Sequence, residues 1–124
     1  LDRLAAEGLR LSNFHVLPTC APTRAVLLTG VDNHTAGIGS QAITAEQEGK
    51  PGYEGYLNNR VATLPEVLRA AGYRTYHTGK WHLGVEASQG PHARCLDETF
   101  TLLAGGESHY AHAYAICAHR TAPG

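Results

Sequence analysis

The chain has 124 residues, in which 10 Lys and Arg nearly balance 11 Asp and Glu to give a formal net charge of −1. A nucleic-acid binder normally carries a clustered basic excess, and a membrane-surface module carries a polybasic segment, so this balance argues against both classes. No apolar run approaches the about 18 residues that a membrane-spanning helix needs, and the length fits one domain. We therefore expect no nucleic-acid partner and no membrane partner.

Three cysteines, Cys20, Cys95 and Cys117, lie far apart in the sequence. They form no C-x-x-C pair, which argues against a zinc ribbon and against a thioredoxin-like redox site. An odd number of cysteines without a signal-peptide profile also argues against a disulfide framework. We interpret Cys95 and Cys117 as inert, whereas the surroundings of Cys20 need a separate explanation.

The N-terminal part of the chain carries signals for a helix, a strand and a second helix. Apolar spacing predicts a short amphipathic helix within residues 1–11, and apolar–polar alternation predicts a strand over residues 11–17. Thr19 offers an N-cap hydroxyl and Gly30 offers a stop. A helix is therefore predicted between them, with Cys20 at its N-terminus.

The middle of the chain is a predicted loop followed by a well-marked helix. Residues 31–60 are rich in glycine and have no sustained period, which predicts a long loop. Thr63 and Glu66 then have the spacing of a capping box, and Gly72 supplies a helix stop. Tyrosine and threonine are enriched in residues 73–78, which predicts a strand.

A helix followed by a tight glycine and a strand is half of a crossover unit, which implies a sheet with helices packed on it. Ligands gather at the carboxyl ends of strands in such sheets. Cys20 and the pair Lys80 and His82 both follow predicted strand ends, so we expect them to share a site. Residues 97–103 are predicted to form a helix or a strand, and residues 110–124 have no firm period.

The segment that begins at Cys20 carries a recognisable motif. Residues 20–30 read CAPTRAVLLTG, and their start resembles the C-x-P-x-R signature of the type I sulfatases, in which the cysteine is oxidised to formylglycine. The second signature of that family is present as GYRTYHTGKWHLG over residues 72–84. Residues 48–58, and residues 102–106 together with 109–110, are similar to the matching stretches of bacterial arylsulfatases. Two signatures in the right order make a chance match improbable.

The resemblance implies an α/β fold, namely a three-layer α/β/α sandwich of the alkaline phosphatase-like type with a mixed, mainly parallel sheet. It implies that residues 1–124 are an incomplete part of a catalytic domain, in which residues 111–124 match the family poorly. An incomplete sheet leaves an open edge, so we expect the chain not to fold stably on its own.

The implied activity is hydrolysis of small-molecule sulfate esters of the arylsulfatase type, after a formylglycine-generating enzyme has converted Cys20. The hydrated aldehyde has two hydroxyls: one attacks sulfur and releases the alcohol, and the other expels sulfate as the aldehyde re-forms. The helix N-terminus offers free N–H groups to the sulfate oxygens. The expected roles are that Arg24 holds the diol, Lys80 pairs with sulfate oxygens and His82 bonds the formylglycine hydroxyl.

Each of these residues also has an ordinary structural interpretation. A lone cysteine before a helix is usually a small buried hydrophobe. Arg24 could equally be a solvated helix residue, and Lys80 and His82 could be polar loop residues. The two signatures taken together favour the functional interpretation for all four.

The resemblance also implies a divalent metal, calcium in most members, held by oxygen ligands. Residue 20 as formylglycine is the ligand that this chain supplies, because the implied Asp pair and Asp-Asn pair are missing. Asp2 and Glu7 are the acidic residues before Cys20, and they form no such pair. One ligand does not hold a metal at useful affinity, so we expect the chain on its own to be inactive.

Two further groups of polar residues resemble metal sites only in their letters. We interpret Asp32 and Asn33 as turn residues, because the Asp-Asn pair of the family belongs far downstream. Ligand-type residues near the C-terminus have no standard zinc spacing and are interpreted as loop or tail: His109, His112, Cys117 and His119.

Two alternative functions stay open from the sequence, and a third is disfavoured. A phosphonate or phosphate monoester hydrolase of the same superfamily would use the same diol, and relative turnover of aryl sulfate and aryl phosphonate separates the two. A non-catalytic remnant would leave Cys20 unconverted, which mass spectrometry of its peptide detects. A cysteine-dependent phosphatase is disfavoured, because its Cys and Arg lie further apart than Cys20 and Arg24.

Overall fold

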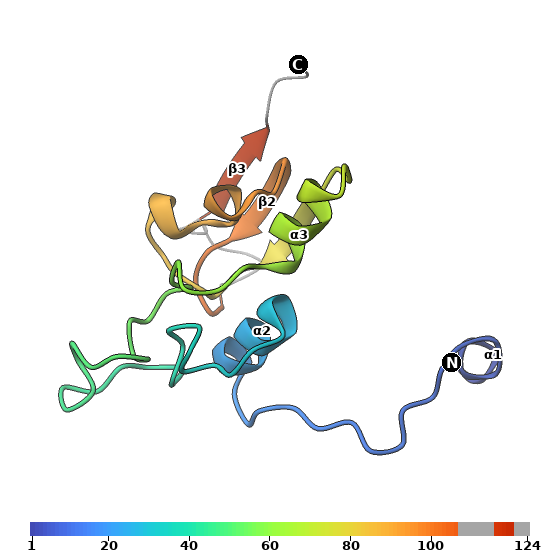
Figure 1. Cartoon of the computed structure of the whole chain (residues 1–124), viewed down its shortest axis with the longest axis horizontal. Helices are drawn as coiled ribbons and strands as arrows, with labels where there is room; N and C mark the ends of the chain where they lie inside the picture. The colour runs from blue at the N-terminus through green and yellow to red at the C-terminus, as the bar shows by residue number, and fades with distance from the viewer. Residues whose placement is uncertain (107–115, 121–124) are drawn as a thin grey trace.

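The computed structural model describes residues 1–106 and 116–120, and Figure 1 shows their arrangement. The helices are α1 (Asp2–Glu7), α2 (Cys20–Thr29) and α3 (Leu64–Ala70), with two short 3-10 helices, η1 (Ala87–Gln89) and η2 (Pro91–Arg94). The strands are β1 (Tyr76–Lys80), β2 (Glu98–Leu102) and β3 (Ile116–Arg120). Among the described residues, no helix combines the length and the apolar character that crossing a membrane requires.

The strands form one mixed sheet in the order β1-β2-β3. β1 and β2 are parallel, with Tyr76 opposite Glu98, and β2 and β3 are antiparallel, with Phe100 opposite Ala118. Parallel neighbours require a crossover connection, which here runs through η1 and η2. The α/β class and the mixed sheet are therefore confirmed. β2 shows that residues 97–103 contain a strand and not a helix, and β3 was not predicted.

The N-terminal segment departs from the sequence prediction. α1 confirms the short helix, but all its residues are exposed, and Figure 1 shows it at the end of an irregular segment that leads to α2. The strand predicted over residues 11–17 is wrong. A strand needs a hydrogen-bonded neighbour, and no described residue pairs with this segment, which leaves Phe14 66% and Val16 65% exposed.

α2 has the predicted bounds, but its N-terminal cap differs from the prediction. Thr19 is the N-cap residue with an extended backbone, yet its side chain makes no capping hydrogen bond. The hydroxyl of Thr23 instead donates to the Leu17 carbonyl oxygen at 2.9 Å, which ties the first turn to the preceding segment. Gly30 ends the helix in the left-handed conformation with φ of 70°, as predicted.

α3 begins and ends as predicted. The Glu66 carboxylate accepts from the Thr63 backbone N–H at 2.6 Å, and the Glu66 N–H donates to the Thr63 hydroxyl at 3.4 Å, which completes the capping box. Gly72 has a φ of 87°, and the Tyr73 N–H donates to the Leu68 carbonyl oxygen at 3.0 Å. Because the helix terminus uses this N–H, β1 starts at residue 76 and not at residue 73.

The predicted loop of residues 31–60 is confirmed, and backbone hydrogen bonds hold its course. The Gly39 N–H donates to the Gly52 carbonyl oxygen at 2.7 Å, which closes the outer part of the loop. The Asn58 N–H donates to the Ala36 carbonyl oxygen at 3.0 Å, which joins the two ends of the loop. Ala36 and Leu57 of the loop belong to the same buried cluster as Ala25 of α2, so the loop packs against this helix.

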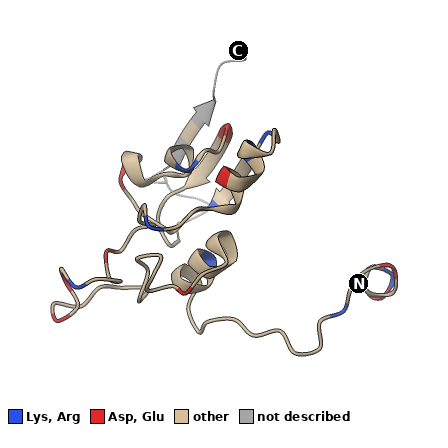
Figure 2. Cartoon of the chain, in the orientation of Figure 1, with Lys and Arg blue, Asp and Glu red and all other residues tan. Residues whose placement is uncertain are grey.

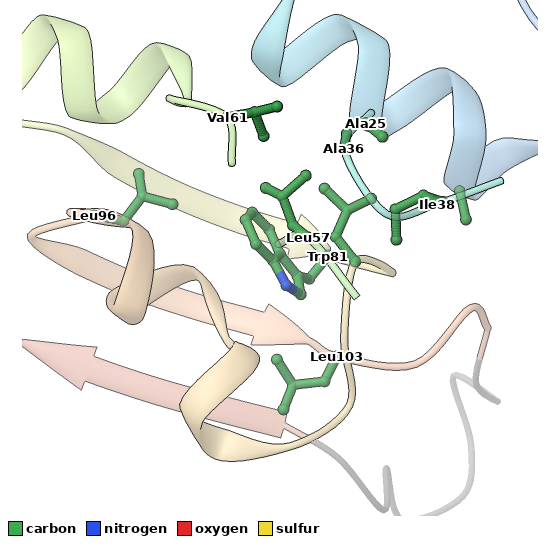
Figure 3. Close-up of a cluster of buried hydrophobic side chains, with 10 residues drawn as sticks. Ala25, Ala36, Ile38, Leu57, Val61, Trp81, Leu96 and Leu103 are labelled. Atoms are coloured by element: carbon green, nitrogen blue, oxygen red, sulfur yellow. The ribbon is translucent and has the colours of Figure 1, made fainter. Parts of the chain in front are cut away.

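The hydrophobic core lies between α2, this loop and the sheet (Figure 3). Trp81 is at its centre with 1% of its surface exposed, and its indole N–H donates to the Gln89 carbonyl oxygen at 3.0 Å. Ala25 and Ala36 are fully buried, because small side chains let α2 approach the loop closely. The core residues are Ala21, Ala25, Ala36, Ile38, Leu57, Val61, Trp81, Leu83, Leu96 and Leu103.

Charged residues of both signs are interspersed along the described chain (Figure 2). Among the described residues, Arg94 and Asp97 are the buried charged side chains, and Arg94 has 5% of its surface exposed. Its guanidinium pairs with the Glu66 carboxylate at 3.0 Å and donates to the carbonyl oxygens of Asn58 at 2.7 Å and Val61 at 2.5 Å. A buried arginine thus joins the end of the long loop to the N-terminus of α3.

Candidate functional site

The Cys20 thiol is the point at which three distant segments meet. Cys20 is the first residue of α2, and its side chain is partly exposed. Its Sγ lies 3.3 Å from Nδ1 of His82, which follows β1, and donates to Oε1 of Gln41 in the long loop at 3.2 Å. The structure therefore brings together Cys20 and His82, which the sequence analysis placed in one site.

Lys80 and His82 reach the thiol by a backbone path that differs from the prediction. An extended segment would put both side chains on one face, but β1 ends at Lys80 and His82 is in the left-handed conformation with φ of 57°. The His82 N–H donates to the Leu103 carbonyl oxygen at 3.0 Å, which holds this turn against the end of β2. The shared position of the two side chains thus depends on the turn.

Arg24 contacts the main chain of the same segment. Its Nε donates to the Trp81 carbonyl oxygen at 2.6 Å, and its Nη2 donates to the Lys80 carbonyl oxygen. The guanidinium is partly buried between α2 and the residues that follow β1. In this structure Arg24 therefore fixes the main chain that carries Lys80 and His82, while its expected contact with the diol stays a prediction.

The electrostatics of the site lower the pKa of both the Cys20 thiol and the His82 imidazole. Partial burial raises the pKa of the Cys20 thiol, but the hydrogen bond and charge of Lys80 and the backbone N–H groups of Ala21 and Cys20 bring it below its ordinary value. Burial lowers the pKa of His82, and the positive charges of Lys80 and Arg24 lower it further. His82 is therefore uncharged at neutral pH.

The donors around Cys20 do not fit a calcium site. They are a thiol, the Gln41 amide, the His82 imidazole and a lysine ammonium, whereas calcium prefers six to eight oxygen ligands. Within the part of the chain that the structure describes, no three or more His, Cys, Asp or Glu residues gather. Asp2 and Glu7 lie on α1, remote from α2 in Figure 1.

The polar groups set aside in the sequence analysis fall into two cases. Asp32 accepts from the His34 N–H at 2.9 Å, and the Asn33 side chain donates to the Ile38 carbonyl oxygen at 2.9 Å, so both are turn residues as predicted. Four others lie outside the described residues or have no described side chain: His109, His112, Cys117 and His119.

Gln41 is the site residue that the sequence analysis missed. It is exposed and belongs to no motif, so only the course of the loop brings its amide to Cys20. Two hydrogen bonds fix the course of the loop. The Gly39 N–H donates to the Gly52 carbonyl oxygen, and the Ser40 hydroxyl donates to the Ala42 carbonyl oxygen at 2.6 Å. No sequence signal identifies such a contact.

Comparison with known proteins places these residues in context. Residues 1–117 match the family model described as "Sulfatase". The chain is 53% identical over 117 residues to an uncharacterized sulfatase of Schizosaccharomyces pombe, covering 90% of this chain and 21% of that protein. It is 40% identical over 110 residues to an arylsulfatase of Klebsiella aerogenes, covering 89% of this chain and 24% of that protein.

A solved structure shows the same likeness in three dimensions. The crystal structure of PsFucS1 sulfatase from Pseudoalteromonas sp. superposes with a TM-score of 0.63 and 31% sequence identity, over 83% of this chain and 20% of that chain. The chain thus spans about a fifth to a quarter of the length of these relatives, 21% and 24% for the two curated proteins.

Proposed function

The chain belongs to the sulfatase family, and from this premise we propose that it supplies the nucleophile-bearing part of a site that hydrolyses small-molecule sulfate esters, with arylsulfatase-type substrates. The observation that supports the proposal is the convergence on residue 20 of His82 at 3.3 Å and of the Lys80 charge. These are the residue types that nucleophilic attack on a sulfate ester needs: an activated centre, a cation and a proton acceptor.

The proposed reactive form of residue 20 is formylglycine, made from Cys20 by a formylglycine-generating enzyme. Its hydrate supplies two hydroxyls on one carbon, so that one displaces the alcohol from sulfur and the other expels hydrogen sulfate as the aldehyde returns. An unmodified cysteine carries one thiol and no hydroxyl, so after attack on sulfur it would have no group to expel sulfate and would stop at the covalent stage. Partial exposure of Cys20 at the start of α2 leaves the side chain open to a small substrate.

The residues around position 20 divide the remaining tasks. α2 has 10 residues, and the free N–H groups of its first turn face the region in which the sulfate oxygens would gather negative charge. Lys80 adds a positive charge beside the side chain of residue 20. Neutral His82 has a ring nitrogen able to accept the hydroxyl proton when sulfate is expelled.

The divalent metal that the sulfatase family uses would need a set of oxygen ligands, which the described residues beside Cys20 do not supply. The described donors beside Cys20 include no carboxylate, so the tasks assigned above rest on this chain's own side chains and backbone. Arg24 acts in this scheme through the main chain of Lys80 and Trp81, which it holds in position.

Conversion and turnover test the proposal separately. We expect co-expression with a formylglycine-generating enzyme to yield a Cys20 peptide lighter than the thiol form, while the Cys20→Ser variant keeps its mass. A chimaera in which this chain replaces the matching segment of the Klebsiella aerogenes arylsulfatase should cleave an aryl sulfate faster than its Cys20→Ala variant. An unconverted peptide together with an inactive chimaera would contradict the proposal. Preferential turnover of an aryl phosphonate would reassign the substrate.

A further inference from the structure

The imidazole of His82 lies directly against the backbone of Gly105. A side-chain carbon at position 105 would lie 2.6 Å from Nε2 and 2.7 Å from Cε1 of His82, closer than such carbons approach other atoms in proteins. The φ of Gly105 is outside the left-handed range, so glycine is not needed there for its backbone conformation. Position 105 needs glycine because the His82 ring occupies the space that a side chain there would take.

Backbone pairing keeps the ring in that space. The Trp81 N–H donates to the Leu102 carbonyl oxygen at 2.8 Å, and the His82 N–H donates to the Leu103 carbonyl oxygen at 3.0 Å. These bonds continue the contact between the two segments past Lys80, the last residue of β1. They also place the residues that follow β2 beside His82, whose left-handed backbone turns the side chain toward Gly105.

The two sides of the ring face different neighbours. Nε2 and Cε1 face Gly105, whereas Nδ1 lies 3.3 Å from the Sγ of Cys20. The ring therefore fills the distance between the Gly105 backbone and residue 20. A larger residue at position 105 would move the ring, and Nδ1 would leave its place beside residue 20.

We propose that Gly105 is a positioning residue of the site, whose lack of a side chain sets the His82 ring with Nδ1 toward residue 20. The inference deepens the proposed function and rests on it for its catalytic meaning, but the packing itself is independent of turnover. Gly106 offers a matched comparison, because a side-chain carbon there would have no neighbour within 4 Å.

Alanine at the two adjacent glycines tests the proposal in the chimaera with the Klebsiella aerogenes arylsulfatase, with Cys20 unconverted, because the chain alone is not expected to fold stably. We expect a nuclear Overhauser effect between the His82 ring protons and the Cys20 Cβ protons in the chimaera with the original chain and in its Gly106→Ala variant. The Gly105→Ala variant should lose that signal while the dispersion of its core resonances, including the Trp81 indole, is retained. A signal that persists in the Gly105→Ala variant would overturn the proposal. Because no turnover is measured, this result is independent of whether the chain supports sulfate ester hydrolysis.

A double variant covers the case in which Gly105→Ala does not fold. Removing the ring by His82→Ala should abolish the clash, so Gly105→Ala should lower the melting temperature in the original chain and leave it unchanged in the His82→Ala background. Recovery of folding in the double variant supports the proposal as well. An equal loss in both backgrounds, or a double variant that stays unfolded, contradicts it.

Discussion

The Arg24 guanidinium binds the main chain of Trp81: Nε donates to the Trp81 carbonyl oxygen at 2.6 Å. Trp81 is the centre of the core, and the residues on either side of it carry the Lys80 and His82 side chains. This contact therefore fixes the position of α2, which bears Cys20, relative to the segment that carries Lys80 and His82. This relationship makes the geometry of the site and the stability of the fold depend on the same arginine.

Replacing Arg24 by lysine should separate the contribution of its charge from that of its hydrogen bonds to the backbone. Lysine keeps the positive charge but cannot donate from two planar nitrogens to two carbonyl oxygens. Losing such charged hydrogen bonds should reduce the free energy of unfolding by about 2 kcal/mol. Urea denaturation measures this in the chimaera with the Klebsiella aerogenes arylsulfatase, in which the other stability comparisons are also made, because the chain alone is not expected to fold stably. Arg74→Lys changes an arginine that is 56% exposed and is the matched control, with an expected change within about 0.5 kcal/mol. Equal effects of the two variants would contradict the assigned role.

The two N-cap threonines should differ in their contribution to stability. Thr63 completes a capping box with Glu66, whereas Thr19 makes no side-chain capping bond. We expect Thr63→Ala to lower the free energy of unfolding by about 1 kcal/mol and Thr19→Ala to lower it by less than about 0.5 kcal/mol. Thermal and urea denaturation of the two variants measure this difference. A larger loss for Thr19→Ala would show that the cap assignment is wrong.

Most features that depend on residues within a turn of one another were predicted correctly, except for the side-chain cap at Thr19, which is not made. The capping box of Thr63 and Glu66, and the helix stops at Gly30 and Gly72, need only local partners, and all are confirmed. The strand prediction was wrong for residues 11–17, because alternation indicates a strand only when a neighbouring strand is present to pair with it.

The candidate site combines a predictable part and an unpredictable part. Cys20 and His82 are 62 positions apart, and two sequence signatures were enough to place them together. The contact of Gln41 with Cys20 and the space that Gly105 leaves for His82 come from loop courses, which single-residue patterns do not encode. Similarly, only the structure shows that Arg24 donates hydrogen bonds to backbone carbonyl oxygens.

Stability in acid should depend on Glu66. Partial burial raises the pKa of this carboxyl, but the hydrogen bonds and charge of Arg94 and the bonds from Thr63 bring it below its ordinary value. A lowered folded-state pKa gives stability that is present above the unfolded pKa of about 4.3 and is lost as the pH falls through the folded value.

The urea midpoint should therefore fall from pH about 5 downward, and less steeply in Glu66→Gln than in the original chain. Glu48→Gln removes an exposed loop carboxylate and is the charge-matched control, which should follow the original chain. Identical slopes for Glu66→Gln and the original chain would show that the Arg94 pair makes no contribution to acid sensitivity.

The ionisation of Cys20 should depend on Lys80. Partial burial raises the pKa of the thiol, and the hydrogen bond and charge of Lys80 then lower it below its ordinary value, with help from the backbone N–H groups of Ala21 and Cys20 itself. Lys80→Gln removes the largest lowering contribution and leaves the burial unchanged. The pH at which the alkylation rate of the thiol reaches half its maximum should therefore rise.

The measurement is the rate of iodoacetamide alkylation of unconverted Cys20 against pH, followed by mass spectrometry so that the other two cysteines are counted separately. Because the thiolate is the reacting species, the midpoint of the rate profile reports the thiol pKa. Lys50→Gln removes an exposed lysine of the long loop and should leave the midpoint in place. A midpoint that moves equally in both variants would mean that overall charge, and not the contact with Lys80, determines the reactivity of residue 20.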